Sequence, residues 1–84
     1  MTAPSEILVY RTRSCPFCVA AEQLLRSRGA VFEEVFLDDH PDRRAATAAI
    51  LPGHYTVPLV VIDGEPLGGF TELQKLDAQG GLSA

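Results

Sequence analysis

The chain has 84 residues, of which 46% are hydrophobic and 21% charged, and its formal net charge is −4. This composition predicts one folded domain over residues 1–84, too small to divide into two. An acidic chain is not typical of nucleic-acid binding, which relies on an excess of Lys and Arg on one face. The apolar runs are too short to cross a bilayer and residues 1–6 do not look like a secretion signal, so we expect a cytoplasmic protein that contacts no membrane.

The first half of the chain reads as a strand, a helix and a second strand. The apolar run in residues 5–10 predicts a central strand that is buried on both faces. A helix is predicted over residues 17–28, with Gly29 as its terminator. Its apolar stripe consists of Phe17, Ala21, Leu24 and Leu25. Residues 31–37 form a second strand, which should be parallel to the first because a helix connects the two.

The second half adds a helix, a hairpin and a final helix. We expect the second helix over residues 43–51, with Asp39 as its cap, and a third strand over residues 59–62. The Asp63-Gly64 pair predicts a tight turn into an antiparallel strand over residues 65–68, where Pro66 indicates a sheet edge. A capping box with Thr71 as the cap and Gln74 reaching back to it starts a last helix over residues 72–79. The order is β-α-β-α-β-β-α.

Residues 14–18, Ser-Cys-Pro-Phe-Cys, hold both cysteines and lie where the first strand gives way to the first helix. Pro16 suits the first helical position, so we predict Cys15 at the N-cap and Cys18 in the first turn. Two thiols at this spacing share one side of the helix and can form a small disulfide. The unpaired N–H groups and the dipole of a helix start favour a thiolate at Cys15. We therefore assign Cys15 as nucleophile and Cys18 as resolving thiol.

Two cysteines at this spacing can also be ordinary small buried residues. The surroundings of the pair favour redox chemistry, because the motif follows a strand, opens a helix and contains a proline. In the cytoplasm such a pair is kept in its dithiol form, which suits a catalytic role better than a structural bridge.

Three separate motifs now occur in a recognisable order. They are Cys-Pro-Phe-Cys after the first strand, Thr56-Val57-Pro58 before the third strand, and Gly68-Gly69 before the last helix. With these motifs nearly the whole chain resembles a dithiol glutaredoxin of the thioredoxin superfamily. The resemblance implies a four-stranded mixed sheet flanked by three helices.

The resemblance also implies a binding groove for glutathione as co-substrate, with no tightly bound cofactor. In the family the proline matching Pro58 has a cis peptide bond, and the backbone of the residue matching Val57 pairs with the substrate cysteine. The γ-glutamyl carboxylate would meet backbone N–H groups at the start of the last helix, which is physically suited to an anion. The residues that we expect to bind glutathione are Arg13, Phe17, Thr56, Val57, Pro58, Gly69, Phe70 and Thr71.

The chain departs from the family pattern at two positions that usually carry cations for the glycyl carboxylate of glutathione. Thr12 and Tyr55 occupy them here. Arg11, Arg13 and His54 are the candidates to replace those cations, and the two arginines would also add positive potential beside the cysteines. Phe17 replaces a more frequent Tyr, and Phe70-Thr71 replaces a frequent Cys-Asp pair.

These features lead to one principal hypothesis and two alternatives. The principal one is a monomeric, glutathione-dependent thiol–disulfide oxidoreductase that acts on protein disulfides and glutathionylated proteins through Cys15 and Cys18. The first alternative is a redoxin that thioredoxin reductase reduces and that donates electrons to ribonucleotide reductase. The second is a metal module, with zinc held by the two cysteines, His40 and His54, or with an iron–sulfur cluster held across a dimer. The wide spacing of the histidines argues against zinc, and we expect no metal site.

Overall fold

The computed structural model describes residues 6–82, and its elements follow the order that the sequence predicts. The elements are β1 (Ile7–Arg11), α1 (Pro16–Ser27), β2 (Glu33–Phe36), α2 (Arg43–Ile50), β3 (Leu59–Ile62), β4 (Glu65–Gly68) and α3 (Phe70–Ala78). Ser5, which we expected in the first strand, lies outside the described residues.

The four strands form one mixed sheet in the order β2-β1-β3-β4. β1 is parallel to β2 and antiparallel to β3, and β3 is antiparallel to β4. The turn between β3 and β4 places both Asp63 (φ 50°) and Gly64 (φ 83°) in the left-handed region, as an Asp-Gly hairpin requires. Pro66 lies in β4 at the edge of the sheet, where no further strand needs its missing N–H.

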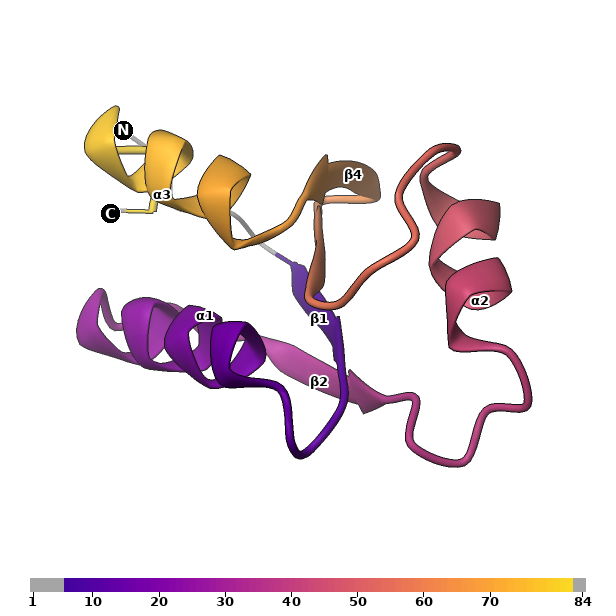
Figure 1. Cartoon of the computed structure of the whole chain (residues 1–84). Coiled ribbons are helices and arrows are strands. Elements are labelled where there is room, and N and C mark those ends of the chain that lie inside the picture. Colours follow the sequence, from indigo (N-terminus) through magenta and orange to yellow (C-terminus); the bar gives the residue numbers. More distant parts are fainter. Residues whose placement is uncertain (1–5, 83–84) are drawn as a thin grey trace.

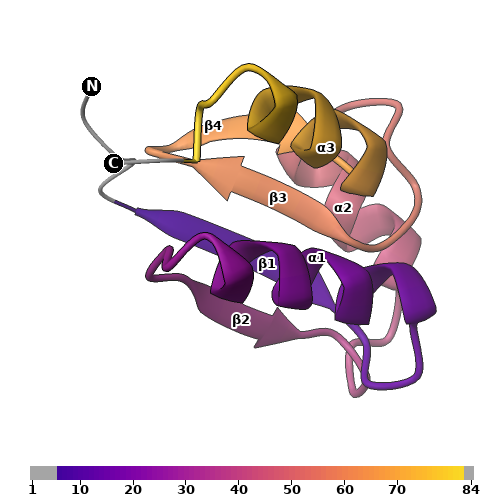
Figure 2. The same ribbon diagram turned by 90° about the vertical axis from the view of Figure 1, so that its left-hand side faces the viewer.

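The helices cover both faces of this sheet (Figure 1). α1 and α3 lie side by side on one face and α2 lies on the other (Figure 2). The main core fills the space between the sheet and the α1–α3 pair. Its fully buried members are Ile7, Val9, Ala21, Leu25, Val60, Leu73 and Leu82.

The apolar stripe of α1 differs from our expectation at Phe17. The helix buries Cys18, Ala21 and Leu25 against the sheet. Phe17 is 65% exposed, because consecutive helical residues are about 100° apart around the axis and Cys18 already faces the core. The ring of Phe17 faces Phe70 on α3 instead, with 6.2 Å between the ring centres.

Two helix caps also differ from the predictions. Asp42, not Asp39, caps α2: its Oδ1 accepts the N–H of Ala45 at 3.1 Å, and only Asp42 directly precedes the first helical residue. α3 begins at Phe70, with Gly69 at the N-cap. In this first turn Phe70 packs against the core, and Glu72 Oε1 accepts the N–H of the N-cap residue Gly69.

Candidate active site

The two cysteines lie at the start of α1 in the geometry that the sequence predicts. Pro16 is the first residue of the helix, and Cys15 is the N-cap with an extended backbone (φ −85°, ψ 114°). The sulfur of Cys15 acts as the capping acceptor, because the backbone N–H of Cys18 donates to it at 3.2 Å. Both cysteines are free thiols. This backbone donor fixes the Cys15 sulfur at the start of the helix.

The two thiols differ strongly in their surroundings. Cys15 is partly exposed, whereas Cys18 is fully buried. Burial raises the pKa of Cys18 to about 12, and the hydrogen bond with Cys15 adds to the increase, while the Thr12 backbone and the charge of Arg11 oppose it. Only the sulfur of Cys15 is therefore open to an external disulfide in this structure.

The segment that precedes β3 forms the wall opposite Cys15. The Val57–Pro58 peptide bond is cis, as the resemblance implied. The Cys15 thiol donates to the carbonyl oxygen of Val57 at 3.6 Å. Pro58 is buried, and its carbonyl oxygen lies 3.2 Å from Nε2 of His54. The polypeptide backbone at Val57 thus lies within reach of a group bonded to the Cys15 sulfur.

The start of α3 forms the third wall. Oε1 of Glu72 accepts the N–H of Gly69 at 2.8 Å and so holds the first turn in place. The N–H groups of Phe70 and Thr71 belong to this turn, whose donors have no acceptor within a helix. Gly68 has a φ of 132°, and a Cβ atom there would lie 2.8 Å from Cγ of Glu72, so both the backbone and the close approach require glycine.

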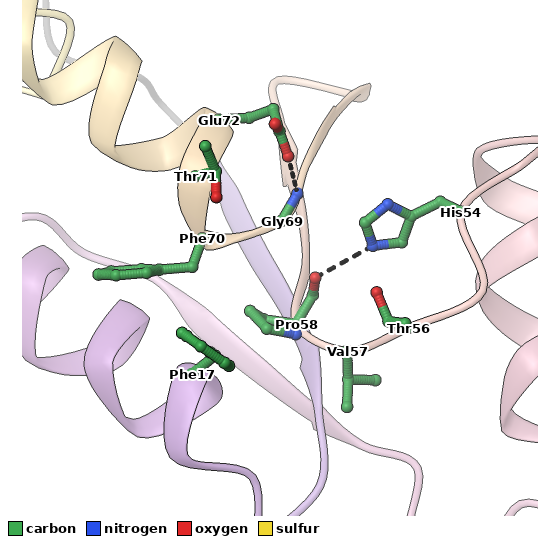
Figure 3. A pocket seen from close by; sticks show the side chains of 9 residues that line it. All are labelled: Phe17, His54, Thr56, Val57, Pro58, Gly69, Phe70, Thr71 and Glu72. Atoms are coloured by element: carbon green, nitrogen blue, oxygen red, sulfur yellow. Dashed lines mark hydrogen bonds between the residues drawn. The ribbon is translucent and has the colours of Figure 1, made fainter.

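These three segments enclose a pocket of about 220 Å³ (Figure 3). Its lining consists of Phe17, His54, Thr56, Val57, Pro58, Gly69, Phe70, Thr71 and Glu72. All residues that we expected to bind glutathione line this pocket except Arg13. The rings of Phe17 and Phe70 project from α1 and α3 toward each other at its rim (Figure 3).

The arginines that were candidates to replace the missing cations have other contacts. Arg11 is buried and pairs with Glu22 and Glu34. The guanidinium of Arg13 lies 5.4 Å from the ring centre of Phe36. Among the described residues, the lining of the pocket includes neither Lys nor Arg.

Glu72 was absent from our predicted site, and His54 was named only as a candidate to replace a missing cation. Glu72 was not assigned because we placed the capping box two residues too late, at Thr71; the correct spacing runs from Gly69 to Glu72. Of the three candidates to replace the missing cations, only His54 lines the pocket, where its Nε2 lies 3.2 Å from the Pro58 carbonyl oxygen.

Within residues 6–82, no three or more His, Cys, Asp or Glu side chains gather in a group that could hold a metal ion. His40 instead accepts the N–H of Asp42 at 3.0 Å through Nδ1. In the same part of the chain, no helix has the length and apolar character that a membrane crossing needs.

An accessible thiol at a helix N-cap, a buried second thiol one turn away and a cis proline facing them define a thiol–disulfide oxidoreductase with a thioredoxin-like fold. The model of the Glutaredoxin family matches residues 7–67. The chain is 36% identical over 78 residues to glutaredoxin 3 of Escherichia coli, with 93% of each protein covered. It belongs to the glutaredoxin family.

Solved structures agree with this assignment. The crystal structure of glutaredoxin 1 from Francisella tularensis, complexed with cacodylate, superposes with a TM-score of 0.76 at 31% identity, covering 88% of this chain and 93% of that one. The buckwheat glutaredoxin–glutathione complex gives a TM-score of 0.79 at 31% identity, covering 90% of this chain and 71% of that one.

Proposed function

We propose that this glutaredoxin reduces protein disulfides and protein–glutathione mixed disulfides through Cys15 and Cys18, with glutathione as its reductant. The observation that carries the proposal is the placement of the Cys15 sulfur, partly exposed and capped by the Cys18 N–H at 3.2 Å. The Val57 carbonyl, 3.6 Å from that sulfur, joins it to the pocket. The protein would act as a cytoplasmic monomer of one domain, without a tightly bound cofactor, nucleic acid or membrane.

The reaction proceeds by two exchanges at sulfur. The Cys15 thiolate attacks a glutathionylated protein at the glutathione sulfur, forms a Cys15–glutathione disulfide and releases the protein thiol. A second glutathione then attacks the glutathione sulfur of that intermediate, which yields oxidised glutathione and restores Cys15. With a protein disulfide as substrate, the Cys15 thiolate attacks one sulfur of that disulfide, forms a Cys15–protein mixed disulfide and frees the first protein thiol. Cys18 then attacks Cys15 Sγ, which releases the second protein thiol and leaves a Cys15–Cys18 disulfide. Two glutathione molecules reduce this disulfide and leave as oxidised glutathione.

Glutathione would occupy the pocket between the Val57 segment and the start of α3. Support comes from the buckwheat relative, which was solved as a glutathione complex. The first turn of α3 offers the Phe70 and Thr71 N–H groups, and such a turn attracts a carboxylate. Because Tyr55 is 52% exposed and stands where the family often has a cation, Tyr55→Arg should lower the KM for glutathione, and Tyr55→Phe provides the neutral control.

The decisive experiment compares the two cysteines in a glutathione-coupled reduction of a small glutathione mixed disulfide. Cys15→Ser should abolish activity, because the attacking sulfur is lost. Cys18→Ser should retain removal of glutathione but lose reduction of protein disulfides, because only the latter needs the second thiol. An equal loss in both variants would contradict this division of roles.

A second candidate function is that of a redoxin reduced by thioredoxin reductase, which donates electrons to ribonucleotide reductase. It is favoured by the absence of Lys and Arg from the lining among the described residues, and by Thr12 and Tyr55 at the usual cation positions. Coupled assays with each reductase separate the two. Turnover with thioredoxin reductase alone would replace the glutathione proposal.

A further inference from the structure

Arg11, the last residue of β1, places a cation in the interior of the protein. It is 5% exposed and lies on the sheet face that α1 covers, because it continues the buried alternation of Ile7 and Val9. Its Nη1 lies 2.6 Å from Oε2 of Glu34 on β2 and 3.3 Å from Oε1 of Glu22 on α1. The guanidinium of Arg11 thus connects β1, β2 and α1.

Stability alone does not account for this arrangement. Removing charges from water is costly, and apolar side chains of similar size often replace a buried ion pair without loss of stability. An apolar residue at position 11 would simply extend the core stripe of Ile7 and Val9. The chain keeps a charge there instead. The pKa of Arg11 is raised, because the hydrogen bond and charge of Glu34 and the charge of Glu22 outweigh burial, which acts to lower it.

The neighbour that gives the cation a chemical role is the resolving thiol. Cys18 and Glu22 are four residues apart on α1, so they lie on the same face one turn apart. The positive charge of Arg11 favours the thiolate form of Cys18 and opposes the rise of its pKa. The backbone of Thr12, the residue after Arg11, also favours the Cys18 thiolate by a hydrogen bond. The Nε of Arg11 donates to the Thr12 carbonyl at 3.3 Å, which holds the guanidinium next to this segment.

We propose that Arg11, held by Glu22 and Glu34, is a positioning residue that stabilises the Cys18 thiolate when Cys18 attacks the Cys15 mixed disulfide. The inference rests on the dithiol route proposed above. In that step a bond forms between the sulfurs of Cys18 and Cys15, and the bond between Cys15 and its partner sulfur breaks; the partner is the substrate protein in the dithiol route and glutathione in the experiment below. The electron pair leaves with the partner sulfur, which takes up from water the proton that Cys18 released.

The groups that act on the Cys18 sulfur determine the sign of each substitution. In the free dithiol, Arg11 and the Thr12 backbone favour ionisation of Cys18, and Cys15 at the N-cap opposes it. In the mixed disulfide Cys15 carries no ionisable thiol, so Arg11 and Thr12 remain, and Glu22 and Glu34 reduce the positive potential of Arg11. Arg11→Met should therefore slow resolution and Glu34→Gln should accelerate it. For each unit by which the pKa of Cys18 rises, the thiolate fraction falls about tenfold while its nucleophilicity increases about threefold, so resolution slows about threefold.

The experiment mixes the reduced protein with oxidised glutathione, quenches with acid and follows the glutathionylated and the internally oxidised protein by mass spectrometry. Arg11→Met should slow conversion of the glutathionylated protein into the internally oxidised protein by about threefold or more. It should change the rate at which the glutathionylated protein forms by less than about twofold. Arg28→Met removes an exposed ion pair with Asp77 at the far end of α1 and should change neither rate. Arg11→Lys should restore part of the resolution rate, because it keeps the charge.

A purely structural Arg11 gives a different pattern, in which Arg11→Met and Glu34→Gln both slow resolution. That pattern, or an unchanged resolution rate in Arg11→Met, would overturn the inference. If Arg11→Met does not fold, the acceleration expected for Glu34→Gln and the rate of Arg11→Lys decide the question. A wild-type protein that forms the mixed disulfide but never the internal one would refute the dithiol route itself, and the inference with it.

Discussion

Glu72 provides a test of the proposed glutathione groove, because its carboxylate has two opposing effects. Its Oε1 accepts the Gly69 N–H at 2.8 Å and so fixes the start of α3. Its negative charge stands in the same turn as the Phe70 and Thr71 N–H groups that we assign to the glutathione carboxylate. Glu72→Gln keeps the acceptor oxygen and removes the charge, whereas Glu72→Ala removes both.

The two variants should separate stability from binding. Glu72→Ala loses a partly exposed, charge-assisted hydrogen bond, worth about 1–2 kcal/mol. In a domain of this size each kcal/mol lowers Tm by about 4–8 °C, so we expect a loss of about 4–16 °C. Two partly exposed charges interact by about 0.2–1 kcal/mol, so removing the repulsion in Glu72→Gln should lower the KM for glutathione by up to about fivefold, with a smaller loss of Tm.

Thermal unfolding and glutathione-coupled kinetics at low ionic strength measure both effects. High salt screens charge and should shrink the KM difference between wild type and Glu72→Gln. An unchanged or higher KM in Glu72→Gln, with the fold intact, would show that the glutathione carboxylate does not bind at the start of α3.

Three further predictions concern Cys18 and Gly68. Because burial raises the pKa of Cys18 above its ordinary value of 9.0, alkylation of Cys18 in a Cys15→Ser background should be slow at pH 8 and increase about tenfold per pH unit through pH 9 and beyond. In the unfolded state Cys18 ionises near pH 9, whereas in the folded state it ionises only near pH 12. The buried, protonated thiol therefore contributes its full stability below about pH 9, and this contribution is lost between pH 9 and 12. Denaturant titrations of the wild type and of Cys18→Ala across this range measure the loss. Gly68→Ala should destabilise the protein and disturb the pocket, since its φ of 132° is unfavourable for alanine and the new Cβ meets Glu72 at 2.8 Å. Gly69→Ala is the matched control, because its Cβ has no neighbour closer than 3.5 Å, and equal Tm losses in the two variants would contradict this reasoning.

The order of elements and the reactive pair could be read from the sequence, because their signals are local. The Asp63-Gly64 turn depends on two residues, and the thiol at a helix start depends on Cys15, Pro16 and Cys18. The family motifs added the cis bond before Pro58, which local physical chemistry alone does not specify.

Helix caps were the weakest local predictions. Asp42 and Gly69 took the N-cap positions that we gave to Asp39 and Thr71. Several residues before a helix can serve as its cap, so a local pattern does not single one out. The first residue of α3, Phe70, also packs against the core, which is a contact with distant parts of the chain.

The amino-acid sequence by itself determined which thiol opens the helix and which strands and helices exist, since hydrogen bonds and periodicity act over a few residues. Only the tertiary structure decided what surrounds those thiols. The placement of Arg11 between Glu22 and Glu34, and of His54 within the pocket, depends on strand pairing and helix packing between segments far apart in the chain. No local pattern encodes such contacts, because they arise only when the sheet forms and the helices cover it.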